Sequence, residues 1–254
     1  MGIYNGFAYI YDALMQDVNY PRWVDYIELL FRHYGVKPRQ IVDLACGTGN
    51  VTILLKERGY EVIGIDQSED MLFVAREKAR SKGMNIPFIF QDMRYISLHH
   101  PVDAMTCICD GINYIPSEEE LDLVFEGVYR YLKPKGIFVF DTSSYYKLSS
   151  IVGNNTFVRT DEDISYIWQN YFDRRSGICE MELSFFVKEG EYYRRFDEIH
   201  YQRAYEVEEI VERLEKNGFV DIGVYQPFTL KPPKKKSERI FFAARKGESC
   251  PKGC

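Results

Sequence analysis

The sequence predicts an α/β protein built on a doubly wound, mainly parallel sheet of seven strands, with an antiparallel β insert. Three observations predict this fold. Short apolar runs alternate with amphipathic stretches through residues 1–144, an antiparallel pattern occupies 145–203, and the α/β pattern resumes over 204–246. The chain has 254 residues, of which 46% are hydrophobic and 28% charged, which fits one large domain with an insert.

The strands of the sheet are predicted from apolar runs that are short and continuous. Such runs indicate parallel strands covered on both faces by helices. They lie at 41–45, 61–66, 88–92, 103–110 and 136–142, and the sheet closes with an antiparallel pair at 219–225 and 239–245. Between them, Ser117 and Glu120 form a capping-box pattern that starts a helix, and Lys133 to Gly136 should end it.

The insert and the two ends of the chain are predicted separately. Long strands at 164–172, 178–188 and 192–203, rich in aromatic residues, predict an antiparallel lid on the substrate side. Near the N-terminus a helix should run from Tyr20 to about Tyr34, and the poorly periodic aromatic segment before it should form a flap. Residues 247–254 should be a flexible tail that carries Cys250 and Cys254.

Composition and charge exclude several classes of protein. The chain has 32 Lys and Arg against 38 Asp and Glu, a net charge of −6, which disfavours nucleic acid as a partner. No run reaches the roughly 18 apolar residues of a membrane helix, and the first residues do not resemble a signal peptide, so a cytoplasmic location is expected. The six cysteines lack the spacing of a zinc site, and no metal is expected.

The strongest functional motif is VDLACGTGN, residues 42–50. A strand runs into a turn with Gly47 and Gly49 and then into a helix, and such a turn lets a ligand approach the backbone closely. The dinucleotide fingerprint fails, because Thr52 stands where it needs a third glycine. Asp43 before the glycines would repel a pyrophosphate and attract an ammonium group. The loop therefore favours a ligand with a cationic amino-acid end over NAD.

Acidic side chains follow the next strands at the same edge of the sheet. Asp66 ends the second strand and could accept both hydroxyls of a ribose, and Asp92 with Met93 ends the third, where an exocyclic amine and a ring nitrogen could bind. Asp110 follows the fourth strand. These positions lie at the carboxyl ends of the strands, where open α/β sheets bind ligands.

In these motifs the chain resembles the class I S-adenosylmethionine (SAM)-dependent methyltransferases, which have a Rossmann-like fold. The resemblance covers about residues 36–246, the insert excepted. It implies SAM as cofactor and S-adenosylhomocysteine (SAH) as product. The implied contacts are Ala45 and Gly47 at the methionine end, Asp66 and Gln67 at the ribose, Asp92 and Met93 at the adenine, and Asp110 at the ammonium group. The N-terminal segment resembles a subgroup that acts on small molecules, so Tyr4, Tyr11 and Trp23 are expected to close over the cofactor.

The expected activity is methyl transfer by in-line displacement to N or O of a small-molecule acceptor. Two alternatives stay open: an RNA or protein methyltransferase, and a SAM-binding protein without catalysis. The sequence assigns no catalytic residue. His200, on a predicted lid strand, has a structural role or faces the acceptor, and Tyr145 and Tyr146 could also face it. A homodimer could form through exposed strand edges of the lid.

Overall fold

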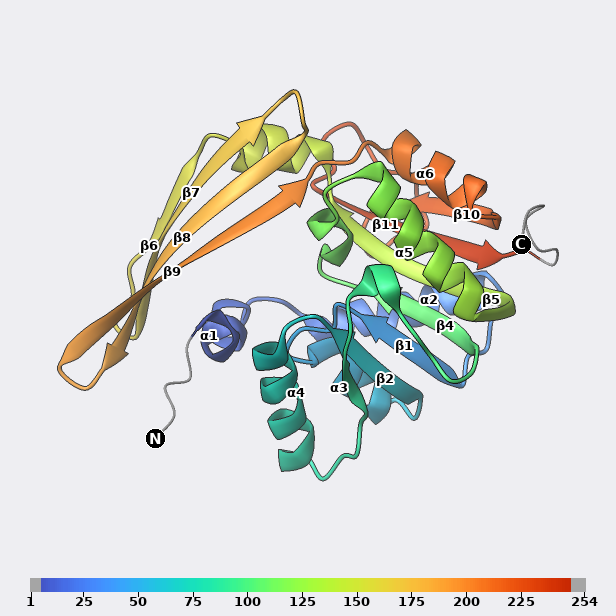
Figure 1. Ribbon diagram of the computed structural model, residues 1–254, viewed down its shortest axis with the longest axis horizontal. Helices are drawn as coiled ribbons and strands as arrows, with labels where there is room; N and C mark the ends of the chain where they lie inside the picture. The colour runs from blue at the N-terminus through green and yellow to red at the C-terminus, as the bar shows by residue number, and fades with distance from the viewer. Residues whose placement is uncertain (1–5, 248–254) are drawn as a thin grey trace.

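The computed structural model describes residues 6–247 and contains two sheets (Figure 1). In the main sheet the strands lie in the order β10-β11-β5-β4-β1-β2-β3, and β11 runs antiparallel to both of its neighbours. Its strands are β1 (Gln40–Leu44), β2 (Glu61–Asp66), β3 (Phe88–Phe90), β4 (Val102–Cys107), β5 (Leu132–Ser143), β10 (Phe219–Tyr225) and β11 (Arg239–Lys246). The predicted seven-stranded, mainly parallel sheet is confirmed.

Helices cover both faces of the main sheet. On one face, α2 (Tyr20–His33) and α3 (Asn50–Glu57) pack on β1, β4, β5 and β11. On the other, α5 (Glu118–Tyr131) and α6 (Val207–Lys216) bury an apolar layer that includes Phe125, Phe138 and Phe140. A third cluster joins α4 (Glu69–Ser81) to α3 and β3. No helix among residues 6–247 has the length and apolar character needed to cross a bilayer.

The second sheet is antiparallel and lies between β5 and α6 in the chain. It contains β6 (Thr156–Arg159), β7 (Ile164–Asp173), β8 (Ile178–Glu189) and β9 (Tyr192–Arg203), in that order. Figure 1 shows it extending away from the main sheet, with α1 (Phe7–Leu14) between it and α4. The last three strands match the predicted ones closely, because polar turns at 174–177 and 189–191 separate them.

Three local features are more detailed than the sequence predicted. The poorly periodic aromatic segment before Tyr20 contains the helix α1, which buries Ala8 and Ile10. The second sheet has a fourth strand, β6, preceded by the short helix η3 (Lys147–Val152). The helix that starts after Ser117 does end before Lys133, at Tyr131, but β5 already begins at Leu132, and its irregular register accommodates Lys135 at φ 65°.

One side chain joins the second sheet to the main sheet at both of its connections. Asn113 lies in the short helix η2 (Gly111–Tyr114) and is fully buried. Its Nδ2 donates to the carbonyl oxygens of Ser143 (3.0 Å) and Arg203 (2.8 Å), and its Oδ1 accepts from the Ser143 N–H (2.9 Å). Because Ser143 ends β5 and Arg203 ends β9, this amide fixes both points at which the chain leaves and re-enters the core.

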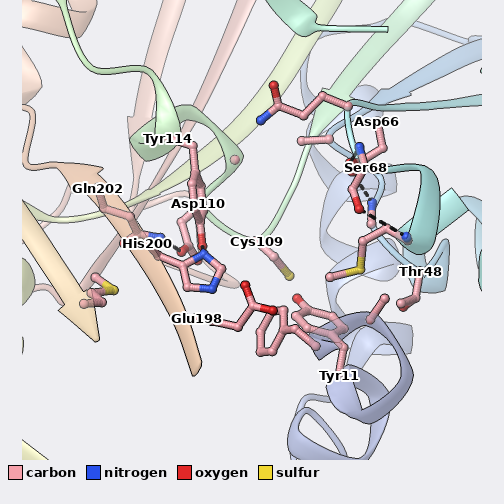
Figure 2. A pocket seen from close by; sticks show the side chains of 18 of the residues that line it. Tyr11, Thr48, Asp66, Ser68, Cys109, Asp110, Tyr114, Glu198, His200 and Gln202 are labelled. Atoms are coloured by element: carbon pink, nitrogen blue, oxygen red, sulfur yellow. Dashed lines mark hydrogen bonds between the residues drawn. The ribbon is translucent and has the colours of Figure 1, made fainter. Parts of the chain in front are cut away.

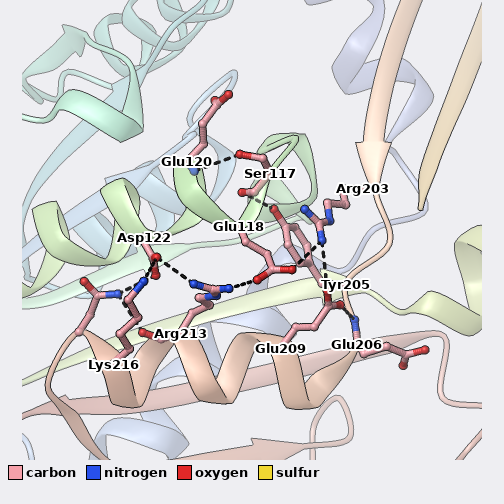
Figure 3. A network of polar contacts seen from close by, with 11 residues as sticks. Ser117, Glu118, Glu120, Asp122, Arg203, Tyr205, Glu206, Glu209, Arg213 and Lys216 are labelled. Carbon is pink, nitrogen blue, oxygen red and sulfur yellow. Dashed lines mark hydrogen bonds and ion pairs between the residues drawn. The ribbon is translucent and has the colours of Figure 1, made fainter. Parts of the chain in front are cut away.

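An ion-pair network holds the returning chain from the outside (Figure 3). Arg203 donates to Glu118 (3.3 Å) on α5 and to Glu209 (3.1 Å) on α6. Arg213 on α6 also pairs with Glu118. The buried Tyr205 donates its hydroxyl hydrogen to the Ile115 carbonyl at 2.8 Å. These contacts tie the end of β9 to two helices that pack on the main sheet.

We expect Asn113→Ala to lower the free energy of unfolding by about 3 kcal/mol, since it leaves buried N–H and C=O groups without partners. Urea unfolding followed by circular dichroism measures the change. Asn85→Ala, at an exposed position, is the matched control and should shift stability by less than about 0.5 kcal/mol. Equal effects of the two substitutions would contradict the role given to Asn113.

Candidate active site

A cavity of about 1050 Å³ lies between the carboxyl ends of the main-sheet strands and the inner face of the second sheet (Figure 2). Eight predicted cofactor residues line it: Tyr11, Ala45, Gly47, Asp66, Gln67, Asp92, Met93 and Asp110. Tyr4 lies outside the described residues. The fold therefore brings together residues from α1 and from four separate turns, and these turns lie at the edge where parallel strands end.

Trp23 does not reach this cavity, contrary to the prediction. It is 8% exposed and packs against Phe228 and Phe241, on the face of the main sheet that α2 covers. The Arg239 guanidinium lies 5.1 Å from its ring, and the same arginine binds Asp110. Trp23 therefore contacts the site only indirectly, through Arg239, and its side chain does not line the cavity.

The glycine turn after β1 has the backbone shape that a ligand loop needs. Gly47 and Gly49 have φ 54° and 76°, and Ala45 also has a positive φ, 50°. A Cβ on Gly49 would lie 3.1 Å from Ala75 and Phe88, so α3 can approach α4 and β3 only with glycine there. A Cβ on Gly47 would meet nothing, which leaves that backbone open toward the cavity.

Asp66 at the end of β2 holds this turn in place. Its carboxylate accepts from the Gly47 N–H at 2.7 Å and from the Ser68 N–H at 2.9 Å, one on each oxygen. Burial raises the pKa of this carboxyl group, and these N–H groups partly offset the effect. Each oxygen keeps a lone pair that can accept a further hydrogen bond. Asp66 can therefore hold the loop in shape and, at the same time, accept a hydrogen bond from a ligand hydroxyl.

Asp43 is buried beneath the glycine turn and lines the same cavity. It is 1% exposed, and its two oxygens accept from the hydroxyls of Thr52 (2.6 Å) and Thr106 (2.7 Å). Burial raises its pKa to about 6. The carboxylate therefore joins α3 to β1 and β4, and its attraction for a ligand ammonium group stays a prediction from the sequence.

The two remaining acids are already paired with arginines. Asp92 accepts from the Arg94 backbone N–H (2.9 Å) and its guanidinium, and Arg94 also pairs with Glu120. Asp110 pairs with Arg239 at 2.7 Å and accepts from Gln202 at 2.9 Å. Burial opposes ionisation of Asp110, yet the nearby Arg239 and Lys147 charges lower its pKa. A ligand amine at either acid would share the carboxylate with an arginine.

Helix α1 is held on both sides, by the core and by the second sheet. On the core side, Asp12 accepts from Thr48 (2.7 Å) and Asn50 (2.9 Å) and pairs with Lys78. On the other side, the Glu198 carboxylate on β9 interacts with the Phe7 N–H at the start of the helix. The expected flap is thus a helix fastened over the glycine turn, and its Tyr11 faces the cavity (Figure 2).

His200, which the sequence named as a residue that could face the acceptor, lines the cavity. Other lid side chains that line it were not identified from the sequence, among them Tyr166, Trp168 and Phe185, and Tyr114 from η2 lines it as well. A signal was present: alternate residues of a strand share one face, so 196, 198, 200 and 202 had to point the same way. The sequence did not show whether that face of the strand points toward the cavity or toward solvent.

Comparison with known proteins agrees with this site. The family model described as "Methyltransferase domain" matches residues 41–136, which include the glycine turn and Asp66. "Putative methyltransferase YqeM" of Bacillus subtilis (strain 168) is 43% identical over 248 residues, covering 97% of this chain and 98% of that protein. The chain belongs to the class I SAM-dependent methyltransferases. It is therefore a methyltransferase that uses SAM as its cofactor.

Solved structures give the same result for the fold. A SAM-dependent methyltransferase from Clostridium acetobutylicum ATCC 824 is 37% identical, has a TM-score of 0.87, and matches 96% of this chain and 99% of its own. The sugar N-methyltransferase KedS8 from Streptoalloteichus sp ATCC 53650 has a TM-score of 0.78 at 18% identity, over 98% of this chain and 96% of its own. The latter similarity shows the fold alone.

The residues of the cavity fit SAM. The Asp66 carboxylate at this edge favours a ligand with cationic groups over a pyrophosphate, whereas the charges of Asp92 and Asp110 are balanced by Arg94 and Arg239. The open backbone at Gly47 leaves room for the amino-acid end, and Asp66 can accept from ribose hydroxyls. Methyltransferases need no metal for this displacement, because the sulfonium already provides a neutral leaving group.

We expect Asp66→Ala to weaken SAM binding by about 1–3 kcal/mol, through the loss of charged hydrogen bonds. Isothermal titration calorimetry with SAM and SAH measures the change. Asp163→Ala, at an exposed position in the turn between β6 and β7, should leave the affinity unchanged. An Asp66→Ala enzyme that binds SAM as tightly as the wild type would remove Asp66 from the site.

Proposed function

We propose that this enzyme transfers the methyl group of SAM to a nitrogen or oxygen atom of a small molecule enclosed between the main sheet and the second sheet. The second sheet then acts as a lid, and the eight core residues named above bind the cofactor. The cytoplasmic location and the homodimer stay predictions from the sequence.

One observation carries this proposal: a single cavity runs from the glycine turn to the inner face of the lid. Its core end is polar, with Asp66 and the turn backbone, and its lid end is lined by aromatic and apolar residues such as Tyr166 and Phe185. SAM at the core end would leave the lid end for an acceptor. Pockets of this size and character take small molecules.

The chain's own residues contribute mainly alignment and exclusion of water. When bound, SAM supplies a methyl group on a positively charged sulfur. Holding an acceptor in line with that group can lower the barrier by about 7–11 kcal/mol. Helix α1 covers the cavity through Asp12 and Glu198, and the Phe7 ring contacts Phe185 of the lid at 5.6 Å between centroids. These contacts would keep solvent from the reacting atoms.

The enclosure also argues against the first alternative. A folded RNA or a protein would need an open approach to the methyl group, whereas residues of the lid and of α1 line the cavity together with the core, which suits a compact molecule. KedS8 shares the fold and is a sugar N-methyltransferase by name. This relationship supports a small acceptor. The second alternative is SAM binding without catalysis, and only a turnover measurement distinguishes it from the proposed function.

The proposal predicts that SAM carrying a trideuteromethyl group labels a small molecule. Purified enzyme and this SAM are incubated with a panel of amines, phenols, hydroxy acids and amino sugars. In separate samples, the enzyme and the same SAM are incubated with protein or RNA from cells. Mass spectrometry should find the label in a small molecule. Label in protein or RNA would contradict the proposal, and SAM binding without any transfer would indicate a non-catalytic protein.

A further inference from the structure

His200 lines the lid side of the cavity, and one of its ring nitrogens is buried without a hydrogen-bond partner among the described residues. It lies on the inner face of β9, between the Phe7 ring (5.3 Å between centroids) and the Tyr114 ring (5.9 Å). Its Nδ1 is 3.4 Å from the Tyr114 hydroxyl oxygen. Its Nε2 is buried, and within residues 6–247 no group bonds to it. Buried polar atoms normally have a partner, so this nitrogen points to a ligand.

The surroundings of His200 keep its ring neutral. Burial lowers the pKa of the imidazole below its ordinary value. The titratable groups that face the ring are Tyr114 from η2, Tyr11 from α1 and Glu198 on its own strand; opposite on β8 is Met181, which carries no charge. Burial and the Asp110 carboxylate raise the pKa of Tyr114, so its phenol stays protonated. A neutral imidazole is the form that can accept a proton.

A second buried polar atom without a partner belongs to the same face of the lid, two strands away from His200. The indole Nε1 of Trp168 is buried without a partner among the described residues, and Trp168 lines the same cavity. The strand register places Trp168, Leu183 and Glu198 in one row across the sheet and His200 in the next. Because an indole N–H only donates, Trp168 requires an acceptor atom on the ligand.

We propose that His200 is the general base for the methyl acceptor, with Tyr114 as the residue that positions its ring. This inference rests on the proposed function and names the acceptor class: a compact molecule with an O–H or a protonated amine, and nearby an atom that accepts from Trp168. For Nε2 to carry the lone pair, the neutral ring holds its hydrogen on Nδ1 and donates it to the Tyr114 oxygen.

The methyl transfer forms one bond while another breaks. The bond from the acceptor atom to the methyl carbon forms as the methyl–sulfur bond breaks, and sulfur keeps the electron pair of that bond. The acceptor's proton moves to Nε2 of His200, which becomes an imidazolium and retains its Nδ1–H bond to Tyr114. The proton passes to water when the products leave. A positioned base of this kind contributes about 100-fold or more to the rate.

The first test needs no acceptor. The enzyme, labelled with ¹⁵N-histidine and saturated with SAH, is examined by NMR, and the His200 signals are assigned by their loss in His200→Gln. We expect a ring that is neutral at neutral pH, with hydrogen on Nδ1 and none on Nε2, and a loss of this preference in Tyr114→Phe. A charged ring, or hydrogen on Nε2, would overturn the proposal. Failure of SAH to bind would instead count against the proposed function.

The second test compares two probes of equal shape, phenol and aniline, in single-turnover methyl transfer. Phenol must lose its proton during the reaction, whereas neutral aniline can attack first. His200→Gln should slow transfer to phenol by about 100-fold and transfer to aniline by less than about tenfold. His100→Gln, at an exposed histidine, is the matched control, and SAH titration shows that both variants fold. An equal loss for both probes would mean that His200 only shapes the cavity.

Discussion

The buried amide of Asn113 is the interaction on which the rest of the site depends. It bonds to the chain where β5 ends and again where β9 ends, so both connections of the lid are fixed to η2. The next residue, Tyr114, lines the cavity and contacts His200. The same short helix therefore sets the position of the lid and the position of a side chain in the reaction site. A shift of η2 would move the acceptor end relative to the cofactor end.

A second constraint comes from the way α1 connects the two sheets. Asp12 bonds to the glycine turn and to Lys78 of α4, and Glu198 of the lid meets the other end of the helix. Since Thr48 belongs to the cofactor turn, binding of SAM and closure of α1 involve the same residues. This arrangement explains why the helix carries aromatic residues on the side that faces the cavity, where they exclude water without adding charge.

Much of this molecule could be predicted from its sequence, for physical reasons that can be named. Buried parallel strands require continuous apolar runs, and Gly47, Gly49 and Asp66 require one another at the turn, so the main sheet and its ligand edge were predictable. The helical state of α1 was not, because the segment is short and its apolar residues show no clear helical period. Trp23 was misplaced because a position in the sequence does not show which face of α2 is buried. The assignment of cofactor contacts stays a prediction that ligand binding must test.

SAM binding at the glycine turn beneath α1, with the lid closing the acceptor end of the same cavity, should change the backbone dynamics of these segments. Hydrogen–deuterium exchange with and without SAH measures that change. We predict slower exchange at residues 45–50, at 66–71 and in α1, with no change in the exposed segment 232–238. Protection confined to other segments, or none in the glycine turn, would contradict the account.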